Sequence, residues 1–282
     1  MSDVLTKSAP IPQPNKEPEK QAATKDHSRI YIYVTLIVLV ILTGCAYVQM
    51  ISENIDWAEA TMKTVENLKI MFAQASFQNI TFVYALKQLL ITFSLAVITS
   101  VLSAVISFLL ALIVAENIVG GIWGRIVRAL VSFIRAVPTV LWVLIFARVT
   151  LGAEAAVMGI SFHSIGYLVK AYAESIEEMD HGKIEALKAT GATWWQIIAQ
   201  AVVPMTISSM IAWTFLRLEI NYMTALAMGA AAGAGGLGYD LFMAGSFYYN
   251  VKEVGAITLL IVATTILLEF VSVSIRKRLK RT

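Results

Sequence analysis

Two charged side chains, Arg217 and Glu219, stand inside an apolar stretch of this 282-residue chain. A charge in the middle of a bilayer costs about 3 kcal/mol or more, so such residues face protein or water. Because positions i and i+2 do not face each other on a helix, each of the two needs a partner elsewhere. Two interpretations follow. Arg217 or Arg135 adds positive potential to a path for anions, since a guanidinium fits oxyanions, or an ion pair such as Arg135 with Glu219 holds helices together.

Metal, disulfide and nucleotide chemistry find little support. Cys45 is the single cysteine, which excludes an internal disulfide framework and a cysteine-based zinc site. It ends a run that looks like a lipoprotein cleavage box, but the apolar run continues beyond it, which favours a plain helical cysteine over a lipidated one. The three histidines lie far apart, without metal-ligand spacing, at His27, His163 and His181.

A glycine-rich segment matches a dinucleotide-binding fingerprint only formally, because no strand of a soluble βαβ unit is predicted before it. Close helix packing or a re-entrant turn explains it better. Its glycines are Gly233, Gly235, Gly236 and Gly238. No phosphate-binding loop of the G-x-x-x-x-G-K-[ST] type occurs in the chain, so the sequence offers no nucleotide site of that type either.

Composition indicates a membrane protein. The chain is 58% hydrophobic and 15% charged, with a mean hydropathy of +0.72, and a soluble domain of this size would need more charge. The net charge of +3 is small and its basic residues form no patch, which argues against nucleic acid. About 20 apolar residues span a bilayer. We therefore predict an all-α integral membrane protein with about six transmembrane helices, over 30–51, 84–115, 126–150, 153–175, 204–230 and 253–274.

Lysine and arginine concentrate on one side of these spans, which predicts that both termini are cytoplasmic. The proline-containing tail 1–29 cannot bury a core and is predicted to be disordered. Residues 52–83 then face outward, and their pattern predicts an amphipathic surface helix or a solvated linker helix. The helical core is predicted over 84–275, followed by a basic tail over 276–282.

The 176–204 loop is the one long polar interruption on the cytoplasmic side. Gly191 can take the left-handed conformation that ends a helix, and Thr193 with Gln196 has the capping-box spacing that starts another. Pro204 suits the first turn of the following helix. The loop is therefore predicted to be a helix–turn–helix. Such a unit is a rigid lever if a partner moves it, or it merely lies on the membrane; local physics does not separate the two.

A family resemblance favours the lever. Glu185-Ala186, Gly191 and the apolar run before Pro204 resemble, in spacing, the EAA loop of permeases in binding-protein-dependent ABC importers. Leu187 stands where that pattern has a second alanine. In the family this loop is the coupling helix that docks on the ATPase subunit. The resemblance implies that the ATPase-coupling residues here are Glu185, Ala186, Leu187, Gly191 and Pro204.

Three further segments resemble the phosphonate-type subfamily. They are Arg135 to Pro138 with Trp142, Arg217 to Asn221, and the glycine segment that ends at Gly238. The resemblance implies that Arg135, Pro138, Arg217, Glu219 and Asn221 lie on the translocation path or form an intramembrane ion pair. Because importers of this type leave tight recognition to an external binding protein, it favours the ion pair.

The resemblance also implies a type I ABC importer permease fold in the bacterial cytoplasmic (inner) membrane. The chain would not be an enzyme and would hold no cofactor, since ATP and Mg belong to the partner subunit. Its expected partners are two ABC ATPase subunits, an extracytoplasmic solute-binding protein, a second permease copy and membrane lipid, and its cargo is a phosphonate or related phosphorus oxyanion. The alternatives are an ion-coupled secondary transporter or channel, an ABC permease for another small solute, and a membrane scaffold without transport.

Overall fold

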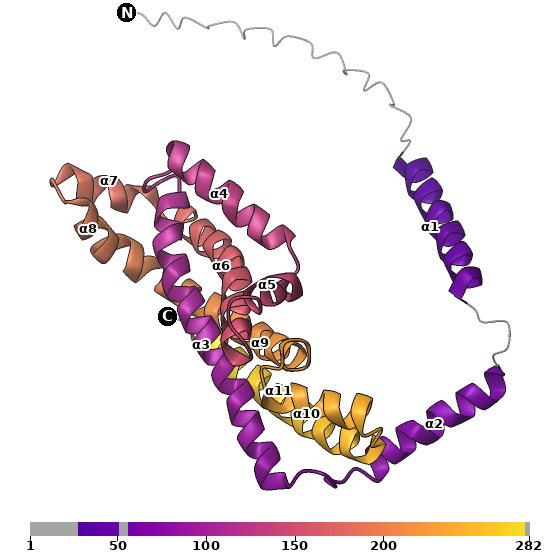
Figure 1. The fold of residues 1–282 in the computed structure, drawn as a ribbon. Coiled ribbons are helices and arrows are strands. Elements are labelled where there is room, and N and C mark those ends of the chain that lie inside the picture. Colours follow the sequence, from indigo (N-terminus) through magenta and orange to yellow (C-terminus); the bar gives the residue numbers. More distant parts are fainter. Residues whose placement is uncertain (1–27, 51–55, 280–282) are drawn as a thin grey trace, which may run out of the picture. The chain divides into compact units, whose positions relative to one another are not determined.

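The computed structural model describes residues 28–50 and 56–279, and every regular element in them is a helix (Figure 1). The predicted tail 1–29 lies outside the described residues except for its last two, which begin α1. The elements are α1 (Ser28–Met50), α2 (Trp57–Ala73), α3 (Phe82–Val114), α4 (Gly121–Ala136), α5 (Thr139–Phe146), α6 (Ala153–Glu177), α7 (His181–Ala189), α8 (Trp194–Ile197), η1 (Ile198–Val202), α9 (Val203–Ala232), α10 (Gly236–Phe242), η2 (Met243–Phe247) and α11 (Val251–Leu279).

The chain divides into two compact units, Met1–Thr61 and Met62–Thr282. In the first, α1 is a 23-residue apolar helix whose described side chains are exposed. Cys45 lies exposed inside this uninterrupted helix. A helix this apolar and this exposed needs a non-aqueous environment, as the predicted span 30–51 does.

Helices α3, α6 and α9 form the centre of the second unit, and α6 packs against both of the others. Small and hydroxyl side chains let α3 approach α6 closely. Ser103 donates a hydrogen bond to the carbonyl oxygen of Ser161 over 3.1 Å, and Ser107 donates to that of Ile165 over 3.2 Å. Hydrogen bonds from serine side chains of α3 to backbone carbonyls of α6 therefore link two of the three central helices.

Four helices are long and apolar enough to cross a membrane, and the bent pair α4–α5 makes a fifth within the described residues. The sequence predicted six spans. The missing one is α6, which is 25 residues long but carries polar residues such as His163 and Lys170. Because α6 lies among other helices, it needs less lipid-facing apolar surface than an outer span does.

The predicted continuous span 126–150 is broken, because α4 and α5 meet at 92° on either side of Pro138. Proline has no backbone N–H and disfavours a helical conformation at the residue before it. The break leaves carbonyl groups without helical partners. The indole Nε1 of Trp142 donates to one of them, the Ile134 carbonyl, over 3.0 Å.

The glycine segment forms a tight turn between α9 and α10. Gly233 ends α9 in the left-handed conformation, at φ +62°, and Gly235 and Gly236 also have positive φ. Gly238 packs so closely on α9 that a Cβ there would lie 1.7 Å from the Leu226 carbonyl oxygen. The geometry is that of the close-packing turn that the sequence analysis preferred to a nucleotide site.

At the end of the bundle opposite α7 and α8 (Figure 1), Glu253 holds the connection that enters α3. Its Oε1 accepts hydrogen bonds from the backbone N–H groups of Gln78, Asn79 and Ile80 at 3.3, 2.9 and 3.0 Å. The side-chain amide of Asn79 donates to Oε2 over 2.6 Å. One buried carboxylate thus fixes the start of α3 to the start of α11.

Candidate functional site

The 176–204 loop is a helix–turn–helix, as predicted (Figure 1). Asp180 caps α7 by accepting a hydrogen bond from the Gly182 N–H over 2.9 Å. Gly191 ends the turn at φ +78°, in the region that favours glycine. Gln196 Oε1 accepts hydrogen bonds from the backbone N–H and the hydroxyl of Thr193 at 2.7 and 3.0 Å, which fixes the start of α8.

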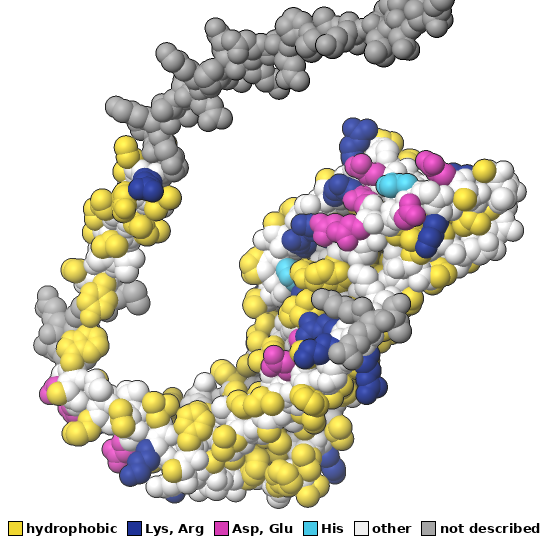
Figure 2. All heavy atoms as spheres, turned by 180° about the vertical axis from the view of Figure 1, so that it is seen from behind, with side chains coloured by type: hydrophobic (Ala, Val, Ile, Leu, Met, Phe, Trp, Pro, Cys, Tyr) yellow, Lys and Arg dark blue, Asp and Glu magenta, His cyan; other side chains and the backbone are white. Residues whose placement is uncertain are grey.

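The loop has an outer face and an inner face. Glu185, Ala186 and Gly191 are exposed on the outer face, and Leu187 is partly buried. On the inner face, Ile184, Ile197 and Ile198 are buried in the same apolar cluster as residues of α3, α6 and α9. Figure 2 shows charged side chains gathered toward the α7–α8 end of the unit, whereas much of the opposite half of that face is hydrophobic. The loop is therefore anchored inward and free to be bound outward.

Pro204 does not begin a separate helix. Residues Trp194–Ala232 form one continuous 39-residue helix, in which the π segment η1 joins α8 to α9. The Val203 N–H donates to the Ile198 carbonyl, five residues back. A proline removes one helical hydrogen bond and crowds the preceding turn, and a wide π turn accommodates both. The second helix of the 176–204 loop and α9 thus belong to one continuous helix.

Arg217 lies on this continuous helix, and only 4% of its surface is exposed. Its Nε donates a hydrogen bond to Ser164 Oγ on α6 over 2.9 Å. Its Cζ lies 5.3 Å from the centroid of the Tyr167 ring, also on α6, in cation–π contact. Among the described residues, no carboxylate forms an ion pair with Arg217.

A polar chain continues from Arg217 through three helices. Ser164 Oγ donates to Asn221 Oδ1 over 2.8 Å, and Asn221 Nδ2 donates to Ser100 Oγ on α3 over 2.9 Å. Ser100 then donates to the Ala96 carbonyl over 2.6 Å. Each of these residues is buried. Asn221, singled out from the sequence, therefore helps to hold the serine that holds Arg217.

Glu219 is paired with Arg276 and not with Arg135, so the ion pair suggested by the sequence is corrected. Arg276 Nη2 lies 3.3 Å from Glu219 Oε1, joining α9 to the end of α11. An arginine near the end of a span can reach inward along its long side chain, and the sequence analysis placed Arg276 in a tail.

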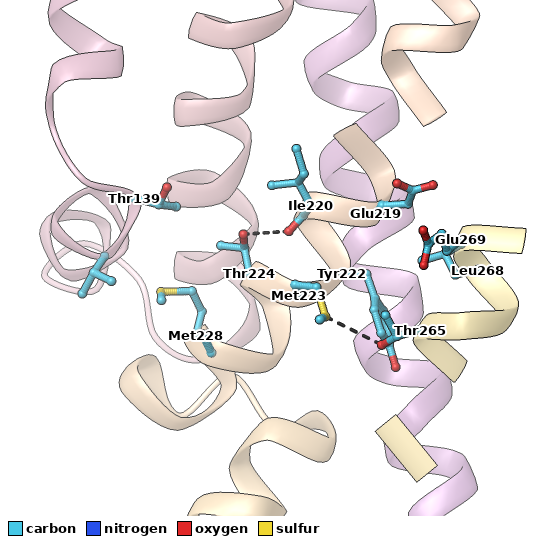
Figure 3. A pocket seen from close by; sticks show the side chains of 12 residues that line it. Thr139, Glu219, Ile220, Tyr222, Met223, Thr224, Met228, Thr265, Leu268 and Glu269 are labelled. Carbon is cyan, nitrogen blue, oxygen red and sulfur yellow. Dashed lines mark hydrogen bonds between the residues drawn. The ribbon is translucent and has the colours of Figure 1, made fainter. Parts of the chain in front are cut away.

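The Glu219 side chain also borders a pocket of about 570 Å³ between α5, α9 and α11 (Figure 3). Glu219 and Glu269 lie on the same side of this pocket, and Thr139, which follows the Pro138 break, lies on the other. Most of the remaining lining is apolar, including Ile220 and Met223. No three His, Cys, Asp or Glu residues of the described ranges gather as metal ligands would.

His163 interacts electrostatically with both Arg217 and Arg135, and neither His163 nor Arg135 supplies a negative charge. Arg135 is exposed in the last turn of α4, and its Cγ would lie 2.8 Å from a Cβ built on Gly166 of α6. The His163 Nδ1 atom is buried and has no hydrogen-bond partner among the described residues. Sequence reasoning considered His163 as a possible metal ligand without suitable neighbours, and it missed Ser164 and Tyr167. A polar or aromatic residue every three or four positions along α6 was the available signal.

Comparison with known families gives a clear result. Residues 107–282 match the profile of the family described as "Binding-protein-dependent transport system inner membrane component". The fold also resembles a solved methionine ABC transporter, MetNI, at TM-score 0.62 and 22% identity, covering 69% of this chain and 95% of that one. A bacterial alginate ABC importer gives TM-score 0.58 at 14% identity, covering 90% and 98%. These likenesses confirm the type of fold.

Curated relatives are somewhat closer in sequence. The phosphite permease PtxC of Stutzerimonas stutzeri is 32% identical over 69% of this chain and 71% of its own length. The phosphate-import permease PhnE of Mycolicibacterium smegmatis is 32% identical over 66% of this chain, but the match spans only 35% of that protein. A probable D-methionine permease of Pasteurella multocida is also 32% identical, over 41% of this chain and 56% of its length.

Proposed function

Because the chain belongs to the family of inner membrane components of binding-protein-dependent transport systems, we propose that it is the permease of an ABC importer for phosphonate, phosphite or a related phosphorus oxyanion. Membership makes it a multi-pass membrane subunit that is not itself the ATPase. The substrate class is supported by relatives that import phosphite and phosphate and are 32% identical to this chain.

The 176–204 loop is the observation that carries the coupling mechanism. Its outer residues Glu185, Ala186 and Gly191 form the surface that a separate ATPase subunit binds. Its inner residues pack in the bundle core, so a displacement of the loop displaces α6 and α9. Closure of two ATPase subunits on ATP then switches the pathway between outward- and inward-open states. A rigid, anchored element with two positions is what such coupling requires.

Three further features complete the proposal. Both termini and the 176–204 loop are cytoplasmic, which agrees with the excess of lysine and arginine on that side. An external solute-binding protein delivers the cargo to the face that carries residues 52–83. A second copy of this chain completes the pathway, because one bundle of this size encloses little space for a solute.

Substitutions at Gly191 test the coupling. A side chain at φ +78° costs about 1–2 kcal/mol for valine and less for asparagine, which tolerates this conformation. A Cβ at Gly191 would meet no atom within 4 Å, so the effect is confined to the turn. We expect Gly191→Val to lower both co-purification of the ATPase subunit and oxyanion uptake, and Gly191→Asn to retain most of both. Equal uptake by the wild type and Gly191→Val would refute the coupling role of this turn.

Labelling tests the orientation. In a Cys45→Ser background, Glu185→Cys is expected to react with a membrane-impermeant maleimide only in inverted vesicles, and less once the ATPase is bound. Labelling of intact cells would place the loop outside and overturn the mechanism. Uptake assays with phosphite, phosphonate and D-methionine decide the cargo. Transport of methionine alone would reassign the substrate, and transport without any ATPase would make the chain a secondary transporter or channel.

A further inference from the structure

We propose that Arg217, His163 and Arg135 form an oxyanion-binding site inside the membrane-spanning bundle, which holds the cargo in transit. We call these three residues the cationic cluster. The proposal rests on the proposed function, because it assigns the step after delivery by the binding protein. It gives the permease itself a role in selecting anions, which the sequence analysis left to the external protein.

The charge balance of the cluster is the first argument. Arg217 is 4% exposed and has no carboxylate partner among the described residues, and the nearby Glu219 is taken up by Arg276. A buried, unpaired cation is strongly destabilising, and proteins normally place an anion beside it or neutralise its charge. Arg135 adds a second positive charge at the same level of α6. An anionic ligand is the missing partner of this arrangement.

The way Arg217 is held is the second argument. Within residues 28–50 and 56–279, Nε is the one guanidinium nitrogen that donates a hydrogen bond, to Ser164, while the Tyr167 ring supports the guanidinium face. The two terminal nitrogens therefore retain their donors. A guanidinium presents paired N–H groups that match two oxygens of one phosphorus centre. Ser164 and Asn221 act as positioning residues, since they fix the orientation of this fork from the side away from the ligand.

An orphaned atom is the third argument. The His163 ring has a backbone hydrogen bond with Val137 and interacts electrostatically with both arginines. Its Nδ1 atom is buried and has no partner in the described part of the chain. A neutral imidazole leaves each ring nitrogen to find a partner, and a buried one is rarely left alone. A protonated oxygen of a monoanion, or a bridging water, supplies the missing donor. The cluster thus offers positive charge and a hydrogen-bond acceptor together, which suits a partly protonated phosphorus oxyanion better than a halide.

The three residues of the cationic cluster differ in how far they are exposed to the surroundings of the bundle. Arg135 is exposed, His163 is partly exposed and Arg217 lies deepest. Arg135 stands in the last turn of α4 just before the Pro138 break, and Arg217 stands on the helix that continues from the 176–204 loop. An anion met first by Arg135 therefore passes to Arg217, and movement of the loop shifts the inner group relative to the outer one.

The test compares stability with transport in the assembled complex. Arg217→Met removes the charge but keeps much of the volume, and Arg148→Met is the matched control, since Arg148 is exposed and outside the cluster. For Arg217→Met we expect loss of uptake by at least about tenfold, as for a lost charge-assisted hydrogen bond, with an equal or higher melting temperature. A structural arginine predicts the opposite: a lower melting temperature with uptake falling only in proportion to the folded protein.

The change in melting temperature on adding an oxyanion tests the site without a transport assay. Sodium phosphite or phosphate, against sodium chloride of equal ionic strength, is expected to raise the melting temperature of the wild type and Arg148→Met but not of Arg217→Met. If Arg217→Met does not fold, Arg217→Lys decides, because it keeps the charge and loses the fork. A wild-type shift and wild-type uptake in Arg217→Lys would overturn the site. Wild-type uptake in Arg217→Met would overturn the site but leave the importer intact. An oxyanion shift without oxyanion uptake would instead refute the proposed cargo.

Discussion

Replacing Ser164 by alanine should disconnect the polar chain that joins α3, α6 and α9. Ser164 Oγ accepts from Arg217 and donates to Asn221, so one substitution leaves two buried groups without their partner. Interhelical hydrogen bonds in membrane proteins contribute about 0.6 kcal/mol on average and up to about 1.7 kcal/mol. Two of them give an expected loss of about 1–3 kcal/mol, or a melting temperature lower by roughly 2–10 °C.

The chain offers a matched control in Ser103. It is also fully buried on a packed helix, and it donates to the carbonyl groups of Thr99 and Ser161. Removing the Ser103 hydroxyl leaves no buried donor unpaired, because the carbonyls of Thr99 and Ser161 still accept the backbone hydrogen bonds of their own helices. Ser103→Ala is therefore expected to cost about 0.6 kcal/mol, for one interhelical bond.

Thermal unfolding of the purified complex in detergent, followed by tryptophan fluorescence, measures both variants. Ser164→Ala should also reduce uptake beyond its effect on folded protein, because the guanidinium of Arg217 loses its orientation, whereas Ser103→Ala should not. Equal melting temperatures for the two variants would show that the hydrogen bonds of Ser164 have no special weight. Normal uptake by Ser164→Ala would remove its role as a positioning residue.

Two other substitutions probe the packing that surrounds the site. Gly238→Ala places a Cβ 1.7 Å from the Leu226 carbonyl oxygen, so α10 must separate from α9, and the folded yield by size-exclusion chromatography should fall sharply. Gly245→Ala meets only a side chain at 3.5 Å and should express normally; similar yields would contradict the close-packing argument. Glu253→Gln weakens charge-assisted hydrogen bonds to residues 78–80, each contributing about 1.5–3 kcal/mol. Amide hydrogen exchange there should accelerate, and unchanged protection would show that the carboxylate is dispensable.

The helical character and the 176–204 loop were accessible to sequence reasoning because both depend on local signals. Apolar runs of sufficient length predicted the main helices, and Gly191 with Thr193 and Gln196 predicted the turn and the next helix start. The bend at Pro138 was not predicted. A proline within an apolar run can kink a span or end it, and the sequence does not say which; here the bend is accompanied by a hydrogen bond from Trp142, four residues after the proline, to the freed carbonyl of Ile134.

The partners of the charged residues could not be read from the sequence. Arg276 lies 57 residues beyond Glu219, and their pairing depends on how α11 packs on α9. Ser164 and Tyr167 are ordinary residues of α6 whose importance appears only when Arg217 is placed beside them. Identifying charged residues inside apolar segments was sufficient to locate the region but not to choose between an ion pair and an unpaired cation.

The wide turn at Ile198–Val202 determines which way the side chains before it face relative to those after it in the continuous helix Trp194–Ala232. Each residue of an α-helix advances the azimuth by about 100°. In a regular α-helix the extra residue would rotate everything on the α8 side by that angle and carry Ile197 out of the core, whereas the wide π turn absorbs the residue and leaves the faces on either side aligned. The wide turn therefore keeps the exposed α8 end of this helix aligned with the face that carries Arg217, about 30 Å farther along the helix axis.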